Sequence, residues 1–218
     1  MATLLCLETA TTNCSVALSV NGSVIAFKED NSRHYSHAEN LHVFINDVLT
    51  SAGLGKEQLD AIVISKGPGS YTGLRIGVSA AKGLCYALDI PLISVPTLAS
   101  LASQVTTTGF VVPMLDARRM EVYSAVFNSN KECIRETKAE IITATSFIEY
   151  LAENRVVFIG NGVEKFQEIC THPNAVFMKE NLPSALQLVA LATEKYKKNI
   201  VEDVAYFEPY YLKDFMKG

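Results

Sequence analysis

The chain has 218 residues, of which 49% are hydrophobic and 19% are charged, and its formal net charge is −4. This composition predicts a folded protein with a sizeable core, in one large domain or two small lobes. The acidic balance and the lack of a Lys/Arg-rich run argue against a protein that grips nucleic acid alone. Five cysteines without a CxxC pair indicate free thiols in a reducing compartment. With no signal-peptide pattern and no long apolar run, the expected location is cytoplasmic, away from any membrane.

The first half of the chain alternates between strand and helix patterns. Three strands are predicted first, and the hairpin signal Asn21-Gly22 joins the second to the third. A helix, a buried strand, a glycine-rich loop with its helix, another strand and another helix follow. The predicted ranges are strands at 3–8, 15–20, 23–29, 59–65 and 91–96, and helices at 36–51 and up to about residue 88.

The second half repeats this order. A strand again ends in a carboxylate, since Asp116 corresponds to Glu8, and the loop at 160–162 corresponds to the loop at 67–69. Such a repeat predicts two duplicated α/β lobes with mixed sheets that face a cleft. The expected lobes are residues 1–105 and 106–218. The second is expected to end in a helix at 183–198 and an aromatic tail that packs back on a surface.

The stretch GPGSYTGLRIGVSAAKG, residues 67–83, resembles a phosphate-binding loop, but its spacing fits neither the P-loop nor the dinucleotide fingerprint. Two interpretations remain. One is a tight turn before a helix, with Ser70 or Thr72 as the helix cap. The other is an anion or nucleotide contact at the helix N-terminus. Its candidate residues are Gly67, Gly69, Ser70, Thr72 and Arg75.

The helix after this loop has more apolar surface than packing on a sheet requires. Its polar side chains form one stripe of Arg75, Ser79, Lys82, Tyr86 and Asp89. A row of small residues on the remaining surface predicts close packing against a second helix. That helix belongs either to a partner protein or to residues 36–51 of the same lobe. The predicted partner interface comprises Leu41, Phe44, Ile45, Val48, Gly73, Gly77, Ala80, Ala81 and Leu84.

Other candidate chemistry is sparse. The spacing of His34, His37 and His42 does not place two imidazoles on one helix face, so surface histidines are expected rather than a metal site. Asp116 is followed by Arg118 and Arg119, which predicts a structural ion pair at this carboxylate. No catalytic residue, metal or cofactor is expected.

Several motifs carry a resemblance to a known family. A duplicated lobe with a carboxylate after its first strand resembles the actin-like ATPase (ribonuclease H-like) superfold of sugar kinases and heat-shock ATPases. The segments LCLETATTNCSVAL, HAENL, GPGSYTGLRIGVSAAKGL, DARRMEVYSAVF and PYYLK resemble the TsaB family. Two positions depart from that family's pattern: Glu8 stands where Asp is usual, and Lys213 where Arg is usual.

The resemblance implies a non-catalytic accessory subunit in the transfer of threonylcarbamoyl to the tRNA adenosine beside the anticodon. Its implied partners are a catalytic TsaD subunit and a TsaE ATPase, with tRNA bound only through the complex and a homodimer in isolation. Two rival functions stay open. One is an ATP-dependent phosphotransferase or ATPase of the same superfold, and the other is a glycoprotease-like peptidase.

Overall fold

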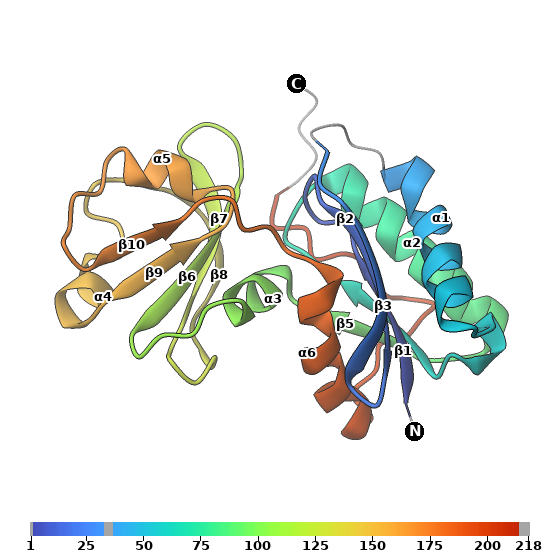
Figure 1. Ribbon diagram of the computed structural model, residues 1–218. Helices are drawn as coiled ribbons and strands as arrows, with labels where there is room; N and C mark the ends of the chain where they lie inside the picture. Colours follow the sequence, from blue (N-terminus) through green and yellow to red (C-terminus); the bar gives the residue numbers. More distant parts are fainter. Residues whose placement is uncertain (1, 33–36, 214–218) are drawn as a thin grey trace. The chain divides into compact units, whose positions relative to one another are not determined.

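The computed structural model describes residues 2–32 and 37–213, which form two compact units (Figure 1). The first unit comprises the chain up to Thr97 together with Pro183–Tyr211. The second comprises Leu98–Leu182 together with Leu212 and Lys213. None of the described helices is long and apolar enough to cross a membrane.

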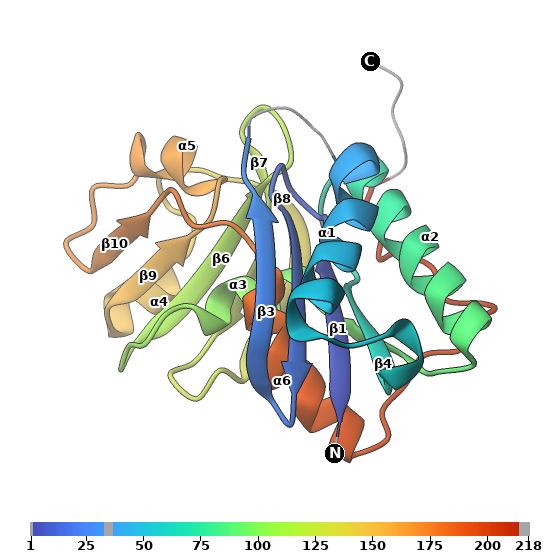
Figure 2. The ribbon, with the colours of Figure 1, turned by 45° about the vertical axis from the view of Figure 1, so that its right-hand side comes forward.

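The first unit is a five-stranded mixed sheet in the order β3-β2-β1-β4-β5. Helices α1 and α2 cover one face of the sheet and α6 covers the other (Figures 1 and 2). β1 pairs antiparallel with β2 and parallel with β4. The elements are β1 (Thr3–Glu8), β2 (Cys14–Val20), β3 (Ser23–Asp30), α1 (His37–Ala52), η1 (Lys56–Gln58), β4 (Ala61–Ser65), α2 (Tyr71–Leu88), β5 (Leu92–Val95) and α6 (Ala185–Lys197).

Side-chain alternation along β1 explains the two layers. Leu5 and Leu7 join the core beneath α1 and α2, whereas Leu4 and Cys6 join the core beneath α6. The Asn21-Gly22 turn adopts positive φ at both residues, 53° and 81°, as a tight hairpin requires. The strand and helix order predicted for this half is confirmed.

The second unit is also a five-stranded mixed sheet, in the order β10-β9-β6-β7-β8. Helices α4 and α5 close one face around edge-to-face contacts of Phe147, Phe158 and Phe166, and α3 packs on the other face. The elements are α3 (Thr97–Ser103), β6 (Phe110–Asp116), β7 (Glu121–Phe127), β8 (Cys133–Ile141), α4 (Ile148–Glu153), β9 (Val156–Ile159), α5 (Val163–Gln167) and β10 (Ala175–Met178).

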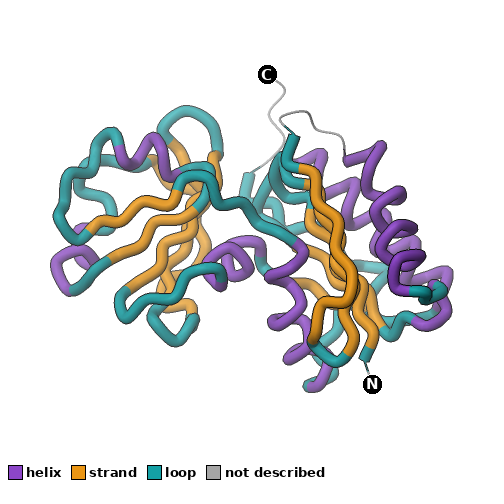
Figure 3. Tube along the Cα trace, viewed as in Figure 1, coloured by secondary structure: helices purple, strands orange, loops and turns teal. Residues whose placement is uncertain are grey.

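The predicted duplication is confirmed by the two sheet orders. Figure 3 shows the strands of both sheets in orange. Read from β8, the second sheet runs β8-β7-β6-β9-β10, which matches β3-β2-β1-β4-β5 element by element. β10 (Ala175–Met178) was not predicted, although it corresponds to β5, the strand predicted at 91–96.

The units do not follow the two halves of the sequence. The helix predicted to complete the second lobe, α6, packs on the first unit's sheet instead, where Ala185, Leu188 and Ala192 share a core with Leu4 and Val63. Ser15 Oγ accepts the Ala185 N–H at 2.9 Å. Conversely, α3 follows β5 in the chain but contributes its apolar face to the second unit. A boundary at residue 105 therefore assigns both helices to the wrong unit.

Candidate functional site

The glycine loop and α2 hold the turn between β1 and β2. A β-carbon added at Gly69 would overlap the Ala10 carbonyl oxygen, and one at Gly73 would overlap the Thr9 carbonyl oxygen. At Gly77 it would overlap the Thr9 hydroxyl. The Ser70 N–H donates to the Ala10 oxygen at 2.7 Å. Glycine at these three positions thus lets the Thr9–Ala10 backbone and the Thr9 hydroxyl approach closely, and nothing in the sequence had pointed to this turn as the group accommodated.

Most groups of the predicted anion site are already engaged inside the first unit. Gly67 N–H donates to Thr97 Oγ1 at 3.0 Å, and Ser70 Oγ accepts the Gly73 N–H at 3.3 Å. The Ser70 contact confirms the predicted helix cap and gives this hydroxyl a structural use. Gly67 has φ 112°, which favours glycine. Thr72 is exposed, so an anion contact stays a prediction for that residue.

Glu8, at the end of β1, is fully buried, and its Oε1 accepts the Ala10 N–H at 2.7 Å. Burial raises the pKa of this carboxyl to about 7, and hydrogen bonds from the Ala10 backbone and the Ser65 hydroxyl lower it only in part. Ser65 Oγ also lies 2.7 Å from Thr97 Oγ1. A buried carboxyl engaged in this way supports the fold of the turn.

Asp116, the counterpart of Glu8, pairs with a different cation from the one predicted. Lys165 Nζ lies 2.5 Å from Asp116 Oδ1. Arg118 contributes only its backbone N–H to the same oxygen, at 3.0 Å, and Arg119 makes no ion pair among the described residues. The prediction of an arginine pair was wrong because α5, from the repeat, brings Lys165 to the end of β6.

The histidines that the structure describes do not form a metal site. His37 is buried and its Nε2 lies 2.7 Å from the Thr11 oxygen, which corrects the prediction of a surface side chain. His42 is exposed, and His34 lies outside the described residues. Among the described residues no group of three or more His, Cys, Asp or Glu side chains is placed to hold a metal ion.

Most of the predicted partner-interface residues lie inside the first unit. Leu41, Ile45, Val48 and Ala81 are at most 2% exposed and belong to the core between the sheet and helices α1 and α2. Gly73 and Gly77 are buried against Thr9, as described above. These six residues therefore stabilise the unit itself, which corrects their assignment. Phe44, Ala80 and Leu84 are only partly buried and remain available at the surface of α1 and α2.

The C-terminal tail lies along the polar stripe of α2, as its aromatic composition had suggested. Lys82 Nζ donates to the carbonyl oxygens of Ala205 and Phe207 at 3.1 and 2.9 Å. Arg75 Nε donates to the Tyr211 hydroxyl at 3.2 Å. The tail therefore contacts the polar stripe of α2 through Arg75 and Lys82.

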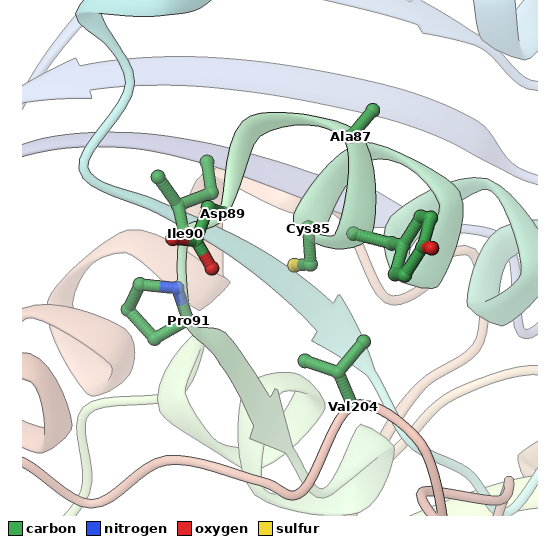
Figure 4. A pocket seen from close by; sticks show the side chains of 7 residues that line it. Cys85, Ala87, Asp89, Ile90, Pro91 and Val204 are labelled. Carbon is green, nitrogen blue, oxygen red and sulfur yellow. The ribbon is translucent and has the colours of Figure 1, made fainter.

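A hollow of about 710 Å³ opens where α2 ends and the tail begins (Figure 4). Its lining is mostly apolar: Cys85, Tyr86, Ala87, Asp89, Ile90, Pro91 and Val204. Burial raises the pKa of the Cys85 thiol to about 11, so it stays protonated at neutral pH and is a poor nucleophile. The hollow is suited to packing rather than to catalysis.

Comparison with known proteins identifies the family. The family described as "TsaD: tRNA N6-adenosine threonylcarbamoyltransferase" matches residues 29–216. The chain is 30% identical to the tRNA threonylcarbamoyladenosine biosynthesis protein TsaB of Haemophilus influenzae, over 97% of this chain and 94% of the relative.

Solved structures agree with the fold. YeaZ from Pseudomonas aeruginosa superposes with a TM-score of 0.84 at 29% identity, over 97% of this chain and 100% of that chain. An activator of 2-hydroxyisocaproyl-CoA dehydratase from Clostridium difficile matches with a TM-score of 0.52 at 12% identity, over 90% of this chain and 96% of the other. That second likeness concerns the fold alone, which is the actin-like ATPase fold. With its paired five-stranded sheets and its near full-length relatives, the chain belongs to the TsaB family of tRNA threonylcarbamoyladenosine biosynthesis proteins, which share the TsaD-type domain.

Proposed function

We propose that this chain is a non-catalytic subunit that pairs with a TsaD-type transferase and makes it competent to modify tRNA. The observation that carries the proposal is the closed β1–β2 turn. Glu8 is fully buried and bonded to Ala10, and the turn rests on the glycines of α2. In active members of the superfold, the carboxylate at this strand end orients a metal-bound water. A carboxyl that is buried and bonded to its own turn is poorly placed for that work, which supports an accessory role.

The partner surface is proposed on the outer side of α1 and α2. Phe44, Ala80 and Leu84 are partly buried there, and Val43 is 53% exposed. Such an apolar strip on two neighbouring helices fits a helix-packing interface. In isolation the same strip would mediate a homodimer. The TsaE-type ATPase would join the assembled pair, and tRNA would bind through that assembly.

Reconstitution tests the proposal. Purified TsaD-type and TsaE-type proteins from the same organism, with ATP, a threonylcarbamoyl donor and unmodified tRNA, are assayed with and without this chain. We expect modified adenosine only when the chain is present, and co-elution of the chain with the TsaD-type protein on gel filtration. Full activity without the chain would contradict the accessory role.

The rival ATP-dependent enzyme is tested on the lone chain. We expect no steady release of phosphate from ATP by the purified protein. A steady rate that Glu8→Ala abolishes would favour an ATPase or phosphotransferase, because loss on substitution would place Glu8 in catalysis.

A further inference from the structure

The turn between β6 and β7 carries two exposed arginines, Arg118 and Arg119, here called the tip arginines. Their φ angles are 72° and 52°, a region that glycine and asparagine adopt far more readily than long side chains do. Because both side chains are exposed, core packing does not account for arginine at either position. A pair of cations kept in an unfavourable backbone conformation points to a role in binding.

The base of this hairpin is held firmly by its own unit. Lys165 Nζ donates to Asp116 Oδ1 at 2.5 Å and to the carbonyl oxygens of Arg119 and Glu121 at 2.8 and 2.5 Å. Asn161 Oδ1 accepts the Asp116 N–H at 3.0 Å. The tip is therefore presented on a fixed support, which lowers the entropic cost of binding.

The charge at the hairpin is not balanced. Lys165 pairs with Asp116, and Lys213 pairs with Glu121. Within the part of the chain that the structure describes, no acidic side chain forms an ion pair with either tip arginine. The hairpin thus presents two uncompensated positive charges on a protein whose net charge is −4.

We propose that the tip arginines contact backbone phosphates of the tRNA that the assembled complex modifies. The inference rests on the proposed function, because that function supplies the RNA. A guanidinium matches a phosphate with two parallel N–H donors, and contacts of this kind position an RNA without reading its sequence. Two such contacts are too few for tight binding by the lone chain, so they add to the affinity of the complex for tRNA.

The test uses the full-length chain with the variant Arg118→Asn/Arg119→Gly. These residues suit positive φ, so the variant is expected to melt at or above the temperature of the unmodified protein. Binding to a tRNA transcript is measured by filter binding over a series of salt concentrations. The lone chain is assayed at low salt, and the complex with the TsaD-type protein at physiological salt.

We expect the variant to bind tRNA about tenfold more weakly, and the slope of log affinity against log salt to fall by about 1.4 to 1.8, for two lost phosphate contacts. Arg118→Lys/Arg119→Lys is expected to recover part of the affinity. Arg155→Ala is the matched control. Arg155 is exposed and precedes β9, beside the start of β6, whereas the tip arginines follow the end of β6, so this variant is expected to leave RNA binding unchanged.

Unchanged affinity and salt slope in the double variant would overturn the inference. So would loss of TsaD-type partner binding with tRNA binding intact, since the hairpin would then be a protein contact. Pairing of the chain with the TsaD-type protein is measured separately, without RNA. If the two proteins do not pair, the proposed function is wrong, and the assay on the lone chain still decides whether the tip arginines bind RNA.

Discussion

The hydroxyl of Thr9, in the β1–β2 turn, occupies the space that a β-carbon on Gly77 of α2 would need. Ile64 Cδ1 lies 3.0 Å from the same point, and both Thr9 and Gly77 are buried. Glycine inside a helix costs about 1 kcal/mol relative to alanine. Here that cost is offset because the turn can approach the helix closely enough to be held by it.

Gly77→Ala is expected to lower the free energy of unfolding by about 1–3 kcal/mol, because the added methyl overpacks the contact with Thr9. Gly83 is the matched control: it lies in the same helix, and apart from its chain neighbours and the backbone of that helix no described atom lies within 4 Å of its added β-carbon. Gly83→Ala is therefore expected to stabilise by about 1 kcal/mol. Urea denaturation measures both. Equal stabilisation by the two substitutions would contradict the contact, and Thr9→Ala should restore part of the loss in the Gly77→Ala background.

The buried carboxyl of Glu8 predicts a pH dependence. Its folded-state pKa is raised to about 7 from 4.5, so its contribution to stability is complete below pH 4.5 and is lost as the pH rises through 7. Glu8→Gln cannot ionise and is expected to remove this dependence, leaving the variant more stable than the unmodified protein at pH 8 by roughly 1–3 kcal/mol.

Thermal melts at pH 5 and pH 8 check this expectation. The difference in melting temperature between Glu8→Gln and the unmodified protein should be smaller at pH 5 than at pH 8, because Glu8 is largely protonated in the folded state at pH 5. A constant difference at both pH values would show that Glu8 does not titrate in this window. Asp116→Asn is the control variant: it removes the carboxylate at the equivalent strand end, where Asp116 is about half exposed and paired with Lys165.

The duplicated sheets were predictable because strand alternation and the repeated carboxylate are local signals. Contacts between segments far apart in the sequence were not predictable. The apolar face of α6 suits either sheet, and only the packing against Leu4 and Val63 decides that it completes the first unit. Likewise, small residues such as Gly73 and Gly77 indicate close approach without naming what approaches. The group that approaches most closely proved to be the β1–β2 turn, with His37 of α1 farther away, 3.3 Å from the β-carbon position of Gly73.

Substitution on the outer side of α2 tests the proposed partner surface. Ala80 is partly exposed, so Ala80→Arg is expected to fold normally but to weaken capture of the TsaD-type protein and self-association at least about tenfold, or 1.4 kcal/mol. Ser79→Arg adds the same charge to the polar stripe and is expected to matter less. Sedimentation velocity with a melt on each sample separates lost binding from lost folding. A well-folded Ala80→Arg protein that still captures its partner would place the interface elsewhere.

The tail offers a matched pair of aromatic side chains. Phe207 is 9% exposed and packs in the core beneath α1 and α2, whereas Tyr206, beside it, is 84% exposed. Phe207→Ala is expected to lower the free energy of unfolding by about 3 kcal/mol, because it leaves a cavity in that core. Tyr206→Ala is expected to change it by about 0.5 kcal/mol or less. Lys82 still holds the backbone of the tail in both variants, so the difference reports burial of the one ring. Equal urea midpoints for the two variants would mean that the tail does not dock on α2 in solution.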